Sequence, residues 1–293
     1  MATEVWTVRR ILTWTTGYLE RKGDEHPRLS AEWLLSNATG LSRVQIYMNF
    51  DRPLTPDELD LMRDGVRRRG AGEPLQYVTG EMPFRHIVLR CERGVLIPRP
   101  ETEILVDAAL EGVDASDADM PRVLEVGTGT GCIACSIAGE REQTIVVATD
   151  ISPQAATLAR RNEEALGLGA RVEIVECDLV DGVPEQLMGT FAVLVSNPPY
   201  IPSAVVPTLP MEVQGFEPGL ALDGGPDGLN VFRRLLAVAP KILAPAGMLC
   251  VELFEENVHV AADLVRAEPG WSTVEVREDL THRPRVLVAV REA

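Results

Sequence analysis

The sequence predicts an α/β protein, with a doubly wound, mostly parallel sheet of seven strands that follows a small N-terminal bundle of helices. Two observations carry this prediction. From residue 122 onward, short apolar runs alternate with helical patterns, and the runs are continuous, which indicates strands buried on both faces. Up to about residue 72, by contrast, apolar residues recur at three- and four-residue spacing, which is typical of helices.

Seven apolar runs are the predicted strands of the sheet. No helical pattern separates the last two runs, so we expect them to form an antiparallel pair at the sheet edge. The runs occupy residues 123–126, 144–149, 171–175, 191–195, 248–253, 273–276 and 285–290.

The chain divides into three predicted parts. A helical domain covers residues 1–72, a β-hairpin linker covers residues 73–100, and the α/β domain covers residues 101–293. Within the linker, residues 76–78 and 87–91 are predicted to be the two short strands of the hairpin, because a glycine lies between them.

The charge of the chain argues against a protein that grips nucleic acid by neutralising many phosphates. The formal net charge is −16. The acidic residues are unevenly distributed along the chain. Residues 1–72 hold 11 Lys+Arg and 10 Asp+Glu, whereas residues 73–293 hold 17 Lys+Arg and 34 Asp+Glu. We therefore expect no direct nucleic-acid partner.

The cysteines and the apolar segments suggest a reducing compartment. Five cysteines without regular spacing suit the cytoplasm, and we see neither a secretion signal at the N-terminus nor an apolar run of membrane-spanning length. Cys132 and Cys135 form a C-x-x-C pair, but a zinc site would need a second pair or nearby histidines. We predict no metal and no membrane partner, and we expect a monomer.

A glycine-rich turn follows the first predicted strand. Residues 125–131 read Glu-Val-Gly-Thr-Gly-Thr-Gly and open a helix. Glycines permit a tight turn and let a ligand approach the backbone, although other nucleotide sites and simple tight connections use them too. A dinucleotide fingerprint would need glycine where Cys132 stands, so the pattern here is G-x-G-x-G.

This spacing, with an acid before the glycines, resembles motif I of class I S-adenosylmethionine methyltransferases, which have a Rossmann-like fold. The resemblance implies S-adenosyl-L-methionine as cofactor, with S-adenosyl-L-homocysteine as product, and Glu125 near its methionine end. Asp150 ends the second strand, where an acid can hold both ribose hydroxyls. Asp178 would accept from the adenine amino group, but either aspartate could instead be a helix cap or a loop acid. The expected cofactor-binding residues are Glu125, Gly127, Thr128, Gly129, Gly131, Asp150, Ile151, Asp178, Leu179 and Asn197.

The tetrapeptide Asn197-Pro198-Pro199-Tyr200 follows the fourth predicted strand, where ligands bind in open α/β sheets. The side-chain oxygen of Asn197 and the carbonyl of Pro198 can accept the two hydrogens of a planar –NH₂ group. Two such acceptors fix the nitrogen and stabilise positive charge as a methyl group arrives. Tyr200 offers a flat face for stacking on the substrate. A proline-rich turn is the simpler alternative, but the position after the glycine turn and Asp150 favours catalysis.

The whole chain resembles the release factor glutamine methyltransferase family. The most specific match is Ile-Pro-Arg-Pro-Glu-Thr-Glu at residues 97–103. The resemblance implies methylation of the side-chain amide N5 of the glutamine in the Gly-Gly-Gln motif of class I peptide chain release factors, with residues 1–72 recognising that substrate. The matching segments are residues 26–35, 40–43, 73–81, 96–103 and 217–229.

The resemblance also assigns roles to individual residues. Arg99 could alternatively be structural, anchored by a carboxylate. One departure is visible after the fifth predicted strand, where residues 251–257 lack the glycine-containing turn that the family tends to carry. The predicted catalytic residues are Asn197, Pro198 and Tyr200. The predicted substrate-binding residues are Asn197, Pro198, Pro199, Tyr200, Arg99, Pro100 and Glu101.

Three alternative functions remain open at this point. A glutamine methyltransferase acting on a ribosomal protein would use the same chemistry. A nucleic-acid adenine-N6 methyltransferase would fit the tetrapeptide but not the acidic charge. An NAD oxidoreductase, or a non-catalytic nucleotide-binding protein, would share the glycine turn and Asp150 but would transfer no methyl group.

Overall fold

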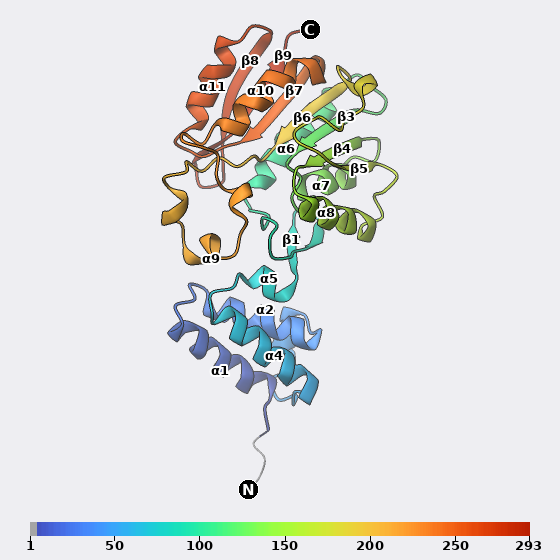
Figure 1. Ribbon diagram of the computed structural model, residues 1–293. Coiled ribbons are helices and arrows are strands. Elements are labelled where there is room, and N and C mark those ends of the chain that lie inside the picture. The colour runs from blue at the N-terminus through green and yellow to red at the C-terminus, as the bar shows by residue number, and fades with distance from the viewer. Residues whose placement is uncertain (1–4) are drawn as a thin grey trace. The chain divides into compact units, whose positions relative to one another are not determined.

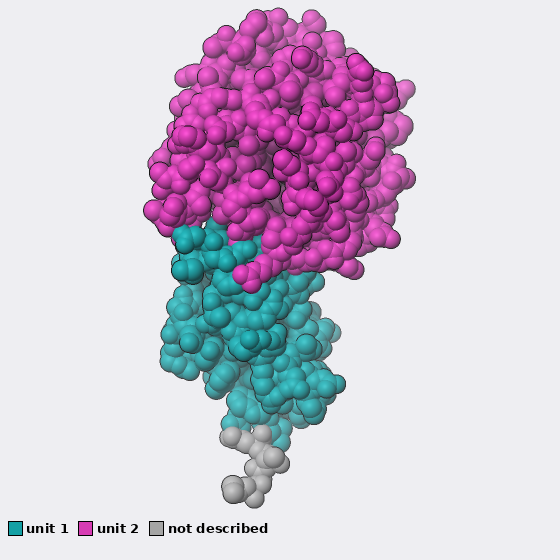
Figure 2. All heavy atoms as spheres, in the orientation of Figure 1, with its two compact units in different colours: residues 1–81, 210–216 teal, residues 82–209, 217–293 magenta. Residues whose placement is uncertain are grey.

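Figure 1 shows the computed structural model, in which residues 5–293 are described. The first four residues of the predicted helical domain lie outside this range. The described chain forms two compact units, coloured separately in Figure 2. One comprises the residues up to Glu81 together with Pro210–Phe216, and the other comprises Met82–Leu209 with Glu217–Ala293. Between residues 5 and 293, no helix combines the length and the apolar character that crossing a membrane would need.

The N-terminal unit is a bundle of helices, as the apolar spacing predicts. Its core holds fully buried side chains such as Leu12, Leu35 and Ile46. Thr55 caps α4 in a capping box with Glu58, which satisfies backbone N–H groups that a helix start leaves unpaired. The helices are α1 (Val8–Arg21), α2 (Pro27–Thr39), α3 (Arg43–Met48), α4 (Pro56–Arg69), α5 (Leu75–Thr79) and α9 (Met211–Gln214).

The prediction that residues 76–78 form the first strand of the hairpin is wrong, because these residues belong to helix α5. Gly80 ends this helix in the left-handed conformation, at φ +80°, which favours glycine. The hairpin that does form lies further along the chain, between β1 (Glu81–Phe84) and β2 (Ile87–Arg90).

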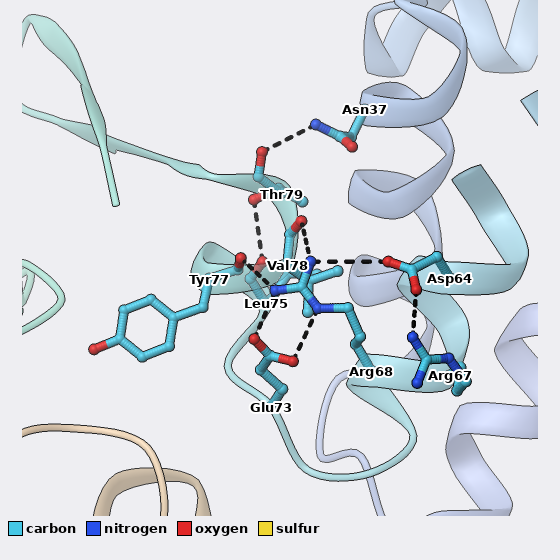
Figure 3. Close-up of polar contacts among 9 residues, drawn as sticks. All are labelled: Asn37, Asp64, Arg67, Arg68, Glu73, Leu75, Tyr77, Val78 and Thr79. Atoms are coloured by element: carbon cyan, nitrogen blue, oxygen red, sulfur yellow. Dashed lines mark hydrogen bonds and ion pairs between the residues drawn. The ribbon is translucent and has the colours of Figure 1, made fainter. Parts of the chain in front are cut away.

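Side chains from other helices of the same unit explain why residues 75–79 are helical. Arg68, at the end of α4, donates to the carbonyl of Tyr77 at 2.9 Å and to the Glu73 carboxylate at 2.6 Å (Figure 3). Asn37 of α2 donates to the carbonyl of Thr79 at 3.0 Å. These donors satisfy carbonyls that the end of a short helix leaves unpaired.

The second unit is built on the seven-stranded sheet that the sequence predicts. Its strand order is β5-β4-β3-β6-β7-β9-β8. The pairs from β5 to β7 are parallel, whereas β9 pairs antiparallel with both β7 and β8, so the antiparallel pair lies at the edge formed by β8. The strands are β3 (Arg122–Val126), β4 (Ile145–Asp150), β5 (Val172–Glu176), β6 (Phe191–Ser196), β7 (Leu243–Glu252), β8 (Trp271–Glu278) and β9 (Pro284–Arg291).

Helices cover both faces of this sheet (Figure 1). Neighbouring strand residues enter opposite cores: Val193 of β6 packs into one cluster and Leu194 into the other. Continuous apolar strands therefore follow from burial on both sides. One face carries α6 (Thr102–Asp114), α7 (Cys132–Glu140) and α8 (Pro153–Ala165), and the other carries α10 (Asn230–Ile242) and α11 (Val258–Ala267).

Replacing Arg68 tests the anchoring of α5. We expect Arg68→Ala to destabilise the chain by about 1–3 kcal/mol, because it removes charge-assisted hydrogen bonds to partly buried acceptors. The matched control is Arg63→Ala on the same helix, whose ion pair with Asp60 is exposed and should contribute less than about 1 kcal/mol. Chemical denaturation measures both, and equal losses would contradict the assigned role of Arg68.

Candidate active site

A cavity of about 210 Å³ lies in the second unit, where the loops after β3, β4 and β6 meet. Because β4 and β6 flank β3 on opposite sides, this is the point where the strand order reverses, and such points bind ligands in α/β sheets. The predicted site residues on its wall are Arg99, Gly127, Thr128, Gly129, Asp150, Ile151, Asp178, Leu179, Asn197, Pro198 and Pro199. The predicted residues off the wall are Pro100, Glu101, Glu125, Gly131 and Tyr200.

The glycine-rich turn forms one side of the cavity. Gly127, Gly129 and Gly131 all have positive φ angles, between 56° and 83°, which residues with a Cβ rarely adopt. Asp150 holds this turn: Oδ2 accepts from the backbone N–H of Gly129 at 2.9 Å, and Oδ1 accepts from that of Ser152 at 2.8 Å. Burial raises the pKa of Asp150. The carboxylate thus braces the turn and reaches the cavity wall.

Glu125 lies behind the turn and is fully buried. Its Oε2 accepts from the Thr128 hydroxyl at 2.7 Å and from the backbone N–H of Ala134 at 3.1 Å. Among residues 5–293, its Oε1 has no hydrogen-bond partner. Burial raises the pKa of Glu125 to about 8. A buried acceptor of this kind favours a cationic ligand at the adjoining wall, such as the ammonium group of the predicted cofactor.

The opposite side of the cavity combines an acid with apolar surface. Asp178 forms an ion pair with Arg234 at 2.8 Å, so its carboxylate already has a partner. Ile151 lines the cavity yet is 52% exposed, which leaves apolar surface for a flat ligand to cover. Leu179 has a φ of +47°, and its carbonyl accepts from the Thr149 hydroxyl at 2.7 Å.

The tetrapeptide brings Asn197 and Pro198 to the cavity but turns Tyr200 away from it. The Asn197 side-chain nitrogen donates to the Thr102 hydroxyl at 3.1 Å, so the Oδ1 oxygen is the end left for a ligand. The Tyr200 ring packs against a core cluster, and its hydroxyl donates to Glu252 Oε1 at 3.2 Å. Burial raises the pKa of the Tyr200 hydroxyl. Tyr200 therefore anchors the tetrapeptide rather than lining the cavity.

A carboxylate holds Arg99, which agrees with the alternative prediction that Arg99 has a structural role. Its guanidinium forms an ion pair at 2.5 Å with Glu217, whose side chain is 1% exposed. Arg99 still lines the cavity, so the two roles are compatible. Pro100 and Glu101 form the turn that precedes α6.

Several residues of the site were missed by sequence reasoning. Thr102 orients Asn197, Arg234 pairs with Asp178, and Glu252 accepts from Tyr200. Thr102 belongs to the quoted segment 97–103, so that match carried a signal for it. Arg234 lies on the exposed part of an amphipathic helix, and nothing in its sequence context marks it.

Two protein-family models match the chain. Residues 10–80 match the family model described as PrmC N-terminal domain, and residues 103–208 match the one described as Methyltransferase small domain. A release factor glutamine methyltransferase of Geobacter sulfurreducens is 46% identical over 250 residues, covering 85% of either chain. One of Rhodopirellula baltica is 41% identical over 285 residues, covering 96% of this chain and 95% of the relative. This chain belongs to the release factor glutamine methyltransferase family.

Membership of the release factor glutamine methyltransferase family confirms the resemblance and the predicted class of enzyme. The fold is confirmed as well. A methyltransferase structure from Pyrococcus furiosus superposes with a TM-score of 0.51 at 21% identity, covering 70% of this chain and 89% of that one. Because the family consists of methyltransferases, the alternative that the glycine-rich turn and Asp150 form the NAD site of an oxidoreductase is rejected.

Replacing Glu125 tests whether burial raises the pKa of its carboxyl group. An ordinary glutamate has a pKa of 4.5, whereas the pKa of Glu125 in the folded chain is raised to about 8. Between these values the unfolded chain releases a proton that the folded chain keeps, so wild-type stability declines as the pH rises through this window. We expect Glu125→Gln, which cannot ionise, to gain thermal stability over wild type at pH 8 relative to pH 5. The control Glu173→Gln alters an exposed side chain and should show no such difference. A pH-independent effect of Glu125→Gln would exclude this titration.

Proposed function

We propose that the chain transfers a methyl group from S-adenosyl-L-methionine to the side-chain amide N5 of the glutamine in the Gly-Gly-Gln motif of class I peptide chain release factors. The observation that carries the proposal is the Asn197 side chain, fixed by Thr102 on the wall of a cavity that the glycine-rich turn also lines. Relatives named release factor glutamine methyltransferase, which match 85% or more of the chain, support the choice of substrate.

The residues around the cavity fit the cofactor. Glu125 offers a buried acceptor oxygen, unpaired within residues 5–293, behind the turn for the methionine ammonium, and Asp150 is placed for the ribose hydroxyls. Ile151 supplies apolar surface for the adenine ring, and Asp178 would accept from the adenine amino group beside Arg234. When bound, the cofactor supplies an activated methyl group as the electrophile, so these residues need only bind and orient.

The tetrapeptide would compensate for the poor nucleophilicity of an amide nitrogen. The lone pair of that nitrogen is delocalised into its carbonyl. Asn197 Oδ1 and the Pro198 carbonyl would accept its two hydrogens, hold the nitrogen toward the methyl donor and stabilise the positive charge that develops. Pro198 is buried and has no N–H, so this part of the loop is stiff and offers an acceptor. Orientation supplies much of the remaining acceleration.

We further propose that the helical residues 1–72 recognise the release factor and that the enzyme acts in the cytoplasm as a monomer. The match of residues 10–80 to a family-specific N-terminal domain supports the first point. The free cysteines suit a reducing compartment. The net charge of −16 disfavours a nucleic acid as the direct substrate.

Mass spectrometry of a purified release factor tests this function. After incubation with enzyme and S-adenosyl-L-methionine, we expect the Gly-Gly-Gln peptide to gain one methyl group on glutamine. A release factor with alanine in place of that glutamine is the matched control. Parallel reactions contain a ribosomal protein substrate or DNA and RNA oligonucleotides. Methylation of one of these, without methylation of the release factor, would contradict the proposal.

Two substitutions separate catalysis from cofactor binding. We expect Asn197→Ala to lower turnover by about 100-fold or more, because it removes an acceptor for the developing charge, while the cofactor Kd stays within about threefold. We expect Asp150→Ala to raise the cofactor Kd by about tenfold or more. Steady-state kinetics and calorimetry measure the two effects. Near-native turnover of Asn197→Ala would rule out the assigned acceptor role.

A further inference from the structure

Arg234 is a charged side chain on the cavity wall that takes no part in the methyl transfer described above. It belongs to α10, lines the cavity together with Asp178, and pairs with that carboxylate at 2.8 Å. We propose that Arg234 is a positioning residue that holds Asp178 toward the base of the cofactor and thereby selects adenine over a base with a keto group in place of the amino group. This inference rests on the proposed function, which places the adenine amino group at Asp178.

The backbone on both sides of Asp178 is fixed by β4. The N–H of Cys177 donates to the last carbonyl of β4 at 3.0 Å, and the carbonyl of Leu179 accepts from the Thr149 hydroxyl at 2.7 Å. The Asp178 side chain is 40% exposed, so packing alone does not set its rotamer. Among the described residues, Arg234 is the side chain that bonds this carboxylate, and it therefore sets the direction in which the carboxylate points.

The helix that carries Arg234 is itself held firmly against the sheet. Phe232 and Leu235, on either side of Arg233 and Arg234, are fully buried in the core that α10 shares with the strands. Val231, one turn before Arg234, also lines the cavity. The start of the Arg234 side chain is thus fixed at the cavity, which favours a guanidinium that is already in place when a ligand arrives.

A neighbouring ion pair provides a comparison on the same helix. Arg233 pairs with Asp227, and the side chains of this pair are 44% and 50% exposed, against 52% and 40% for Arg234 and Asp178. Ion pairs this exposed contribute little to stability, so a stabilising role does not account for Arg234. The two pairs differ in position. Arg234 and Asp178 line the cavity, whereas, in the part of the chain that the structure describes, Arg233 and Asp227 lie off its wall.

The oxygen that the ion pair leaves over matches an amino group. Nη2 of Arg234 donates to Oδ2 of Asp178, so Oδ1 remains as an acceptor for a ligand. Carboxylates are ionised at neutral pH and then only accept hydrogen bonds. Adenine presents a donor at its exocyclic amino group, whereas hypoxanthine has a carbonyl oxygen at that position. Two acceptors that face each other stay unpaired, so a carboxylate held in place rejects hypoxanthine.

Removal of Arg234 would release this constraint. The exposed carboxylate of Asp178 could then turn into the solvent, because its backbone would still be fixed but its side chain would not. Adenine would lose part of its hydrogen bond, and hypoxanthine would no longer meet a fixed acceptor. The two bases would therefore respond differently to the same substitution, which a loss of general stability would not produce.

Calorimetry with two ligands tests the inference on the whole chain. The ligands are S-adenosyl-L-homocysteine and S-inosyl-L-homocysteine, which carries hypoxanthine. We expect the wild type to bind the first about tenfold or more tightly than the second. Arg234→Ala should raise the Kd of the first by about three- to tenfold and leave that of the second within about twofold. Arg234→Lys, which can still pair with Asp178, should keep the ratio of the two Kd values within about threefold of wild type.

A double variant and a matched control complete the design. Because Arg234 acts through Asp178, Asp178→Ala/Arg234→Ala should bind both ligands as Asp178→Ala does. Arg233→Ala removes the comparable ion pair and should leave both Kd values within about twofold of wild type. Equal weakening of both ligands by Arg234→Ala would mean that the guanidinium contacts the base directly, and that result, like unchanged binding of both, would overturn the inference.

These measurements use neither a release factor nor methyl transfer, so they separate this inference from the proposed function. Equal affinity of the wild type for the two ligands would overturn the inference and leave the methylation of glutamine to its own test. Selectivity that depends on Arg234, in an enzyme that methylates no glutamine, would support the inference and contradict the proposed substrate alone.

Discussion

The pairing of β3 between β4 and β6 is the constraint on which the site depends. All three strands run parallel, so their carboxyl ends reach the same edge of the sheet. The loops that leave them are the glycine-rich turn, the segment after Asp150, and the Asn-Pro-Pro-Tyr tetrapeptide. A shift of one residue in any of these pairings would reverse which core each strand residue enters.

Three buried carboxylates of the second unit bind donors in or near the site, at a cost to stability. Glu125, Asp150 and Glu252 are each at most 9% exposed, and burial raises the pKa of all three. A core built for stability alone would hold apolar residues at these positions. Each carboxylate instead binds donors that shape the site: Thr128 and Ala134 for Glu125, Gly129 and Ser152 for Asp150, and Tyr200 for Glu252.

Anchoring and function are combined in the same residues of this site. Arg99 lines the cavity while Glu217 holds its guanidinium, and Asn197 lines the cavity while Thr102 holds its amide. A side chain held in this way loses little conformational freedom when a ligand binds, which favours tight positioning. Tyr200 is the exception, because its ring and its hydroxyl are both used within the protein.

The sequence alone determined the elements whose signals are local. Apolar runs located the seven strands, and the spacing of Gly127, Gly129 and Gly131 indicated the turn in which all three adopt positive φ angles. The tetrapeptide identified the segment that carries Asn197 and Pro198 to the cavity. Only the tertiary structure decided features that depend on partners distant in sequence. Residues 75–79 are helical because Arg68 and Asn37 satisfy their carbonyls. Tyr200 faces Glu252, 52 residues away, and Asn197 is oriented by Thr102, 95 residues away. A hydrogen bond between such residues leaves no periodic pattern in the sequence, because it exists only after the sheet has brought the two segments together.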